Sequence, residues 1–395
     1  MFKVDAEAAG FDPTRLARID EHLLRGYVDP GKIAGAQVLV ARGGQVAHVA
    51  SLGYADREAG TRVADDTIFR YYSMTKPVTG VALLTLYERG LFQLSDPVHR
   101  LIPSWREVTV REGDQDVSAH RPPTIRDVMM HMAGIGYSVG NADLDIDGGV
   151  PRVPWRTLEE LADGVVASPL RFQPGTHWLY SFGMDVCARL VEILSGMRFD
   201  EYLRTVLFEP LGMTDTAFFV AEEERHRFAA LYARNRRKEL VRLDGQPYDV
   251  EPTLFNGGGG LVGTTADYFR FAQMLANGGE LDGVRILGSR TVELMRSNHL
   301  PDGGELRDFA LPGGYGEVGF DGMGFGLTVA VTLDQVRTQV IGSPGELMWG
   351  GAASTIFWVD PVEDLVCVFM TQLLGSGTFN FRGQLKSIIY PAIVD

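Results

Sequence analysis

Cysteine, lysine and long apolar segments are scarce in this chain of 395 residues. The two cysteines, Cys187 and Cys367, each lie between apolar neighbours, so the sequence predicts two buried thiols and no disulfide. No stretch approaches the roughly 18 apolar residues that a membrane-spanning helix requires. The first residues also lack the apolar segment of a secretory signal. We therefore expect a soluble, cytoplasmic protein without a membrane partner.

Positive charge is also in short supply, and this limits the possible partners. The formal net charge is −14, and the only basic run, residues 234–238, is short and typical of a solvated turn. We therefore expect no nucleic-acid partner. Hydrophobic residues make up 45% of the chain and charged residues 22%, which is the balance of an ordinary globular protein.

Patterns that bind metals or phosphates are missing as well. The eight histidines form no His-Glu-x-x-His grouping and the cysteines lie far apart, so we predict no metal. The glycine run 257–260 is not followed by the Lys-Ser/Thr pair of a phosphate loop, and a tight bend near the site explains it better. His131 lies in an apolar helical segment and is expected to be a hydrogen-bonded structural residue. No cofactor is predicted.

Strand-like segments lie toward both ends of the chain, with helical segments between them. The expected strands are 35–41, 45–53, 325–333, 354–359 and 364–371, and the expected helices are 78–90, 124–132, 157–166, 181–195, 265–277 and 380–390. This order predicts an α+β fold in which helices flank one antiparallel sheet. We assign residues 1–75 and 200–395 to a discontinuous α/β sandwich domain, and 76–199 to a mainly helical domain that closes over a cleft.

The stretch YYSMTKPVTG, residues 71–80, places one of only five lysines, Lys76, three residues after Ser73. The helical pattern begins just after the serine, and Pro77 falls in the first turn, where a missing N–H costs little. Residues three apart share a helix face, so the amine can reach the hydroxyl. A buried lysine that loses its proton can activate a serine nucleophile. The alternative is a helix-capping serine with a surface lysine.

Two further segments carry groups that such a nucleophile needs. Tyr180 lies between a Pro-Gly turn and the helix 181–195, where its hydroxyl could serve as acid or base, although a core aromatic is the simpler reading. The segment 349–352, Trp-Gly-Gly-Ala, directly precedes the strand 354–359. Its glycines allow a ligand to approach the strand edge, and a backbone N–H there, with that of Ser73, could form an oxyanion hole.

These motifs, Ser73-x-x-Lys76, Tyr180-Ser and Trp349-Gly-Gly, resemble in order and spacing those of the serine β-lactamase and penicillin-binding-protein superfamily. The chain is most similar to its class C-like esterase branch, the family VIII carboxylesterases. Three stretches, 124–135 (TIRDVMMHMAGI), 209–218 (EPLGMTDTAF) and 257–261 (GGGGL), look like the connecting motifs of these proteins. The resemblance therefore covers nearly the whole chain and implies a β-lactamase/transpeptidase-like fold.

The resemblance also implies a role for each matching residue. Ser73 is expected to be the acylated nucleophile, Lys76 its base and Tyr180 the proton shuttle. The amides of Ser73 and Ala352 are expected to be the oxyanion donors. No cofactor takes part in this chemistry.

Two departures from β-lactamases affect the expected substrate. Trp349 stands where these enzymes have the lysine of Lys-Thr-Gly, and Phe182 stands where they have the asparagine of Tyr-x-Asn. Both changes replace polar anchors by apolar walls, which favours neutral esters over anionic lactams. We therefore expect a serine carboxylesterase for small-molecule, short-chain esters. The residues expected to bind the substrate are Trp349, Gly350, Gly351, Phe182 and Tyr137.

Several alternatives stay open. Gly136-Tyr137-Ser138-Val139-Gly140 matches the G-x-S-x-G elbow of α/β-hydrolases, but it follows a helix and precedes a loop-like segment, which is the reverse of the required context. The same machinery could instead serve a β-lactamase, another amide hydrolase or an acyltransferase. A non-catalytic penicillin-binding relative is a further possibility, and the oligomeric state is open. His177 lies near Tyr180 and could line the entrance.

Overall fold

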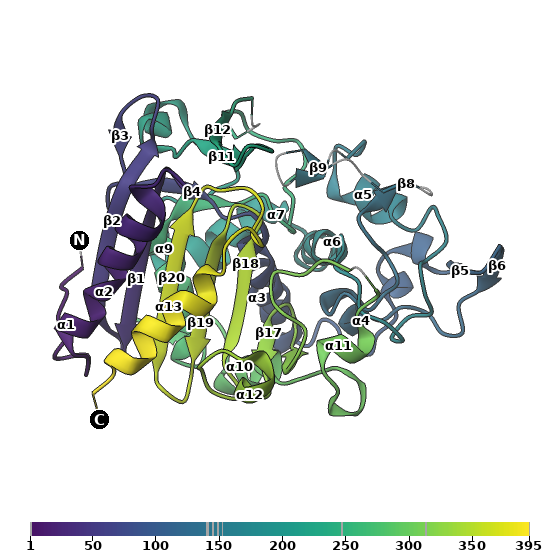
Figure 1. Cartoon of the computed structure of the whole chain (residues 1–395). Helices are drawn as coiled ribbons and strands as arrows, with labels where there is room; N and C mark the ends of the chain where they lie inside the picture. The colour runs from purple at the N-terminus through teal and green to yellow at the C-terminus, as the bar shows by residue number, and fades with distance from the viewer. Residues whose placement is uncertain are drawn as a thin grey trace.

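An eight-stranded antiparallel sheet forms the centre of the fold (Figure 1). The computed structural model describes residues 2–394 except 140, 141, 144, 145, 148, 149, 152, 246, 247 and 313. In spatial order the strands are β16 (Met323–Phe325), β17 (Ala330–Thr332), β18 (Leu347–Gly351), β19 (Thr355–Asp360), β20 (Leu365–Thr371), β1 (Gly35–Arg42), β2 (Gln45–Asp56) and β3 (Thr61–Arg62). The predicted α+β class with one antiparallel sheet is confirmed.

The two ends of the chain meet within this sheet. β1 pairs with β20, with Ala36 opposite Thr371. β1 is almost entirely buried, as a strand covered on both faces must be. It turns into β2 through Gly43 and Gly44, whose φ angles of 58° and 73° suit the tight turn of a two-residue hairpin. The hairpin predicted at this point is confirmed.

Helices cover both faces of the sheet (Figure 1). The first and last helices lie together on one face: α1 (Pro13–Leu16), α2 (Arg18–Leu23) and α13 (Phe381–Ile389). α9 (Thr265–Ala276) packs against β19 and β20 from the other side. The Asp12 side chain starts α1 by accepting hydrogen bonds from the amides of Thr14 and Arg15.

A second group of helices lies beyond the strand β18, with α4, α5 and α6 on the right in Figure 1. They include α3 (Thr75–Glu88), α4 (Ile125–Met129), α5 (Leu158–Gly164), α6 (Gly183–Ser195) and α7 (Phe199–Leu203). α3 is buried on all sides from its first residue to Leu86, and α6 packs against it. The serine of the Ser-x-x-Lys motif therefore leads into a central helix. The division into domains at residues 75 and 199 stays a prediction.

A small strand pair brings two distant segments to the serine. β4 (Ile68–Arg70) ends just before it, and β13 (Val262–Thr264) follows the glycine run. The two strands pair antiparallel, with Arg70 opposite Val262. This pairing places residues 257–261 next to the start of α3.

Two predicted boundaries are wrong. The single strand expected over 325–333 is divided into β16 and β17 by a turn in which Thr328 adopts a φ of 75°. This turn packs against α3, since a Cβ on Gly80 would lie 2.4 Å from the Thr328 hydroxyl. The Trp349-Gly350-Gly351 segment is also not the edge of the next strand, because it forms a strand of its own, β18, and a turn separates it from β19.

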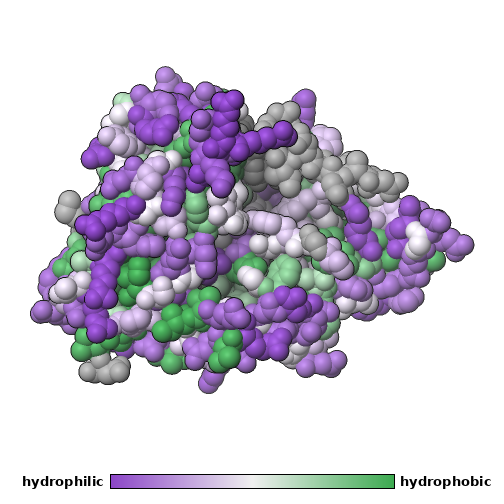
Figure 2. Space-filling view, in the orientation of Figure 1, coloured by the Kyte–Doolittle hydropathy of each residue, from purple (hydrophilic) through white to green (hydrophobic). Residues whose placement is uncertain are grey.

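The thiols and the surface agree with a globular domain. Cys187 and Cys367 are buried and unpaired, as predicted. Hydrophilic residues predominate on the face seen in Figure 2, with hydrophobic residues in small groups among them. Among the described residues, no helix combines the length and apolar character needed to cross a bilayer.

Candidate active site

Ser73 and Lys76 lie together at the start of α3. Ser73 is on a short 3-10 turn, Tyr72–Met74, and Lys76 is the second residue of the helix that follows. Lys76 Nζ donates a hydrogen bond to Ser73 Oγ at 3.2 Å. Lys76 is only 1% exposed, and the N-cap of α3 is Met74, without a side-chain hydrogen bond. The structure therefore contradicts the alternative of a capping serine with a surface lysine.

The glycine run supplies the second partner of the lysine. Lys76 Nζ donates to the Gly258 carbonyl at 2.5 Å, and the Gly258 amide donates to Asp185 Oδ1 on α6 at 3.0 Å. A side chain at position 258 would clash, because its Cβ would lie 2.7 Å from Asp185 Oδ2. A larger residue at this position would therefore displace the Asp185 carboxylate that accepts the Gly258 hydrogen bond. The peptide fixes the Lys76 amine beside the serine.

Burial changes the proton affinity of this amine. It lowers the pKa of Lys76 from 10.5 to about 8, while the charges of Asp185 and Glu317 act in the opposite direction. Burial also raises the pKa of Asp185 to about 6, although the charge of Lys76 favours its ionised form. Lys76 can therefore accept a proton near neutral pH.

Tyr180 lies beside Ser73 and Lys76, just before α6. Its ring centroid is 4.6 Å from Lys76 Nζ, and its hydroxyl accepts a hydrogen bond from Trp349 Nε1 at 3.3 Å. Burial raises the pKa of Tyr180 well above its usual value, and the neighbouring Tyr137 and Glu317 raise it further. A hydrogen bond with Ser73 offsets part of this rise. Tyr180 therefore holds its proton near neutral pH and is suited to donate it.

Strand β18 lies against the turn that carries Ser73. A Cβ on Gly351 would lie 2.3 Å from the Tyr71 carbonyl oxygen, so only glycine allows this approach. Thr355 Oγ1 donates to the same carbonyl at 3.2 Å. Tyr72 has a φ of 47°, which is rare for a bulky residue and marks a strained backbone directly before the serine. Ala352 follows β18 immediately, and its role as an oxyanion donor stays a prediction.

Aromatic rings surround this group. The Tyr137 ring centroid lies 5.6 Å from that of Tyr180 and 4.7 Å from that of Phe182. Phe182 is fully buried and also packs against Trp155. Tyr137 is therefore the ring beside Lys76 and Tyr180, and Phe182 supports it from behind. The structure brings Ser73, Lys76, Tyr180, Trp349, Gly351 and Tyr137 together around one point.

Several residues that border the Ser73, Lys76 and Tyr180 group were not predicted from the sequence. Asp185 and the Gly258 carbonyl set the position of Lys76, and the glycine run was the only visible signal, interpreted as a bend. No sequence pattern indicated a role for Glu317. His131 is a buried, hydrogen-bonded residue as predicted, with Nδ1 3.0 Å from Ser181 Oγ, and its ring also packs against Tyr180. The burial of His131 lowers its pKa well below the usual value, and the charge of Lys76 lowers it further.

The competing motif around Ser138 lacks the context of a nucleophile elbow. Ser138 begins the two-residue strand β7 (Ser138–Val139), which pairs with β8 (Ala142–Asp143). The next helix in the part of the chain that the structure describes is α5. His177 is exposed and contacts Thr176. No three His, Cys, Asp or Glu side chains among the described residues are grouped so as to hold a metal ion.

Comparisons with known proteins identify the family. The model of the family described as Beta-lactamase matches residues 21–386. Protein Rv1367c of Mycobacterium tuberculosis is 32% identical over 360 residues, which is 88% of each chain. Esterase EstB of Burkholderia gladioli is 30% identical over 402 residues, covering 94% of this chain and 95% of EstB.

A solved structure agrees with this result at the level of the fold. EstCE1, described as a hydrolase with promiscuous acyltransferase activity, aligns with a TM-score of 0.80 at 24% identity. The alignment covers 96% of this chain and 99% of EstCE1. The family and fold predicted from the motifs are thus confirmed. The chain belongs to the beta-lactamase family, a family with a serine hydrolase fold.

Proposed function

We propose that this protein is a serine carboxylesterase that hydrolyses short-chain esters through an acyl-enzyme on Ser73. The proposal rests above all on one observation, the buried Lys76 amine 3.2 Å from Ser73 Oγ with a pKa lowered to about 8. A lysine in this state is the base that a serine hydroxyl requires. The 30% identity to an esterase, over nearly the whole of both chains, supports an ester substrate.

In acylation, Ser73 Oγ attacks the ester carbonyl carbon while Lys76 Nζ takes the hydroxyl proton. The amides of Ser73 and Ala352 stabilise the negative oxygen of the tetrahedral intermediate. Tyr180 gives its proton to the leaving alkoxide and recovers one from the protonated Lys76 through the hydrogen bonds around Ser73. The alcohol departs and an ester of Ser73 remains.

Deacylation repeats these steps with water in place of the serine. Water attacks the acyl carbon and gives a proton to the Lys76–Tyr180 pair, and Ser73 Oγ takes a proton as it leaves. The carboxylic acid is released and every side chain returns to its starting state. Lys76 serves as the base in both halves, and Tyr180 carries the proton between it and the leaving oxygen.

Hydrolysis of neutral esters is expected to exceed that of anionic substrates. We expect kcat/KM for p-nitrophenyl butyrate to be about a hundredfold higher than for nitrocefin, whose carboxylate would find the Trp349 indole in place of a lysine. p-Nitrophenyl hydrogen succinate is the matched control, because it keeps the ester, the leaving group and the length of the acyl chain and replaces the terminal methyl group by a carboxylate. Equal rates on both esters would contradict a preference set by charge. Faster turnover of nitrocefin than of p-nitrophenyl butyrate would make the protein a β-lactamase.

Activity is expected to rise with pH. Lys76 must be neutral to accept the serine proton, and its pKa is lowered to about 8. The value of kcat/KM should therefore increase about tenfold per pH unit below this value and level off above it. Initial rates at constant ionic strength, corrected for spontaneous ester hydrolysis, measure the curve. A rate that falls as the pH is raised from about 6 to 9 would be incompatible with a neutral lysine base.

A further inference from the structure

A buried carboxylate borders the site on the side of the sheet. Glu317 lies between α11 (Leu306–Phe309) and β16 and is 8% exposed. Its Oε1 accepts a hydrogen bond from the Tyr315 hydroxyl at 2.7 Å. Its Oε2 is buried and has no hydrogen-bond partner among the described residues. A buried, half-satisfied carboxylate is costly, so its retention calls for an explanation.

Arg382 ties the backbone of Glu317, rather than its carboxylate, to the strand of the active site. From α13, its Nη1 donates to the Glu317 carbonyl oxygen at 2.9 Å and its Nη2 to the Trp349 carbonyl oxygen at 3.2 Å. A Cβ on Gly350 would lie 3.4 Å from Glu317 Oε2 and 3.2 Å from Arg382 Nη2. The Glu317 carboxylate and the Arg382 guanidinium therefore both lie within contact distance of position 350 on β18.

Tyr315 connects the carboxylate to the catalytic tyrosine. The ring centroids of Tyr315 and Tyr180 are 5.9 Å apart, and the Tyr315 hydroxyl also bonds to Ser376 Oγ at 2.6 Å. Tyr315 is half exposed, whereas the Glu317 oxygen without a partner is closed to solvent. A substrate can therefore touch Tyr315 but not this oxygen. Glu317 must act through its neighbours and its charge.

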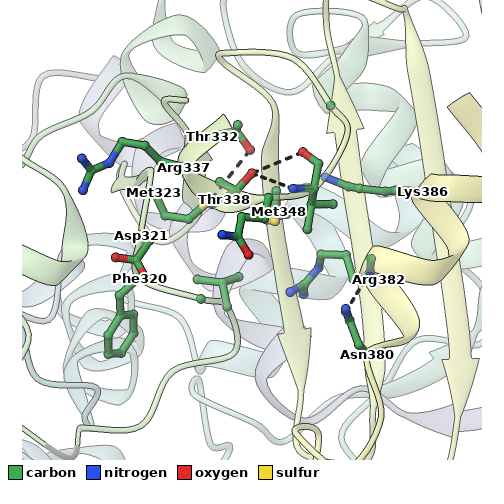
Figure 3. A pocket seen from close by; sticks show the side chains of 16 residues that line it. Phe320, Asp321, Met323, Thr332, Arg337, Thr338, Met348, Asn380, Arg382 and Lys386 are labelled. Atoms are coloured by element: carbon green, nitrogen blue, oxygen red, sulfur yellow. Dashed lines mark hydrogen bonds between the residues drawn. The ribbon is translucent and has the colours of Figure 1, made fainter. Parts of the chain in front are cut away.

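Glu317, Tyr315 and Arg382 line a cavity of about 600 Å³. A neighbouring cavity of about 590 Å³ lies between α13 and β18, and neither Glu317 nor Tyr315 lines it (Figure 3). Its other basic side chains already have acidic partners. Arg337 pairs with Glu305, and Lys386 pairs with Glu346. Arg382 lines the same cavity, but both of its Nη atoms are engaged by carbonyl oxygens. Arg382 therefore joins the Glu317 backbone to β18 at the border between the two cavities.

We propose that Glu317 is a positioning residue of this active site, which holds Tyr315 against Tyr180 and keeps a negative charge near Lys76. The expected effect of Glu317 on turnover rests on the proposed function. Its expected effect on the pKa of Lys76 does not, because that pKa can be measured without a substrate. A negative charge at this place stabilises the ammonium form of the lysine and makes the amine a stronger base.

The other charged and titratable groups around the pair are few. Lys76 on α3 faces Asp185 on α6, and His131 follows α4. Glu317 faces Arg382 on α13 and Tyr315 on its own segment, and its charge also acts on Tyr137 and Tyr180, whose pKa it raises. Burial raises the pKa of Glu317, whereas the hydrogen bond from Tyr315 and the charges of Lys76 and Arg382 favour its ionised form. Glutamine at position 317 removes the charge at nearly constant shape.

The test is a titration of the lysine side chains followed by NMR in protein labelled with ¹³C-lysine, which gives only five lysine signals to assign. In Glu317→Gln, the pKa of Lys76 is expected to fall by about half a unit or more. Glu317→Asp keeps the charge and should retain most of the wild-type value. Glu222→Gln, at an exposed position, is the control and should leave it unchanged. An unchanged Lys76 titration in Glu317→Gln would overturn the proposal.

A second variant distinguishes the effect of the Glu317 charge from the effect of the Tyr315 position. Tyr315→Phe keeps Glu317 but loses both hydrogen bonds of the hydroxyl, so KM for p-nitrophenyl butyrate is expected to rise severalfold while the Lys76 titration stays in place. In Glu317→Gln, the rising limb of kcat/KM is expected to move to lower pH by the same amount as the Lys76 pKa. A Lys76 shift as large in Tyr315→Phe as in Glu317→Gln would also overturn the proposal. Absence of wild-type esterase activity would refute the proposed function while the titration still tests Glu317.

Discussion

Replacing Ser73 by alanine is expected to lower kcat/KM for p-nitrophenyl butyrate by about ten-thousandfold or more, because the acyl-enzyme can no longer form. The change removes one oxygen atom that does not cap α3, so the fold should be little affected. Steady-state rates and thermal unfolding measure the two effects separately. Intact mass after reaction with a fluorophosphonate supplies a third measurement, since wild type should gain one adduct and Ser73→Ala none.

Ser138→Ala is the matched control for this experiment. It makes the same chemical change at the serine of the G-x-S-x-G motif, and we expect full activity and a normal adduct. Activity that survives in Ser73→Ala and is lost in Ser138→Ala would reverse our assignment of the nucleophile. A wild-type protein that gains no adduct at all would instead be a non-catalytic relative.

Local sequence patterns predicted the regular parts of the fold because neighbours in the chain determine them. The β1–β2 hairpin was visible in Gly43 and Gly44, which supply the left-handed backbone of a tight turn. The division of 325–333 was not visible, because Thr328 adopts its unusual conformation in a turn that packs against Gly80 of α3. Strand β18 was missed as well, since its two glycines weaken any strand pattern.

The active site likewise combines residues that can be paired from their spacing in the chain with residues that only the fold brings together. Ser73 and Lys76 could be paired from their spacing alone, because residues three apart share one face of a helix. Tyr180 and Trp349 gained their expected roles only from the resemblance to a family. The Gly258 carbonyl is 182 residues from Lys76, and the chain folds it into place through the pairing of β4 and β13. No spacing rule relates groups that meet only in the folded protein.

Replacing Lys76 by methionine is expected to lower kcat/KM at pH 8 by about a thousandfold or more, the second largest loss that we predict. Methionine has nearly the length of lysine but cannot accept the Ser73 proton. The reaction of Ser73 with a fluorophosphonate should slow in parallel, because the serine is no longer activated. Thermal unfolding serves as the check on folding, since Asp185 and Glu317 lose a nearby cation.

The pH dependence of two variants identifies the base. In Lys76→Met, the rise of kcat/KM with pH below about pH 8 should disappear, because this rise reports the loss of a proton from the lysine whose pKa is lowered to about 8. In Tyr180→Phe, the proton shuttle is lost and kcat/KM should fall by about a hundredfold, but its rise with pH should remain. The high pKa of Tyr180 keeps its proton in place over this range, so it cannot produce that rise. A rise that survives in Lys76→Met and vanishes in Tyr180→Phe would exchange the two roles and make the tyrosine the base.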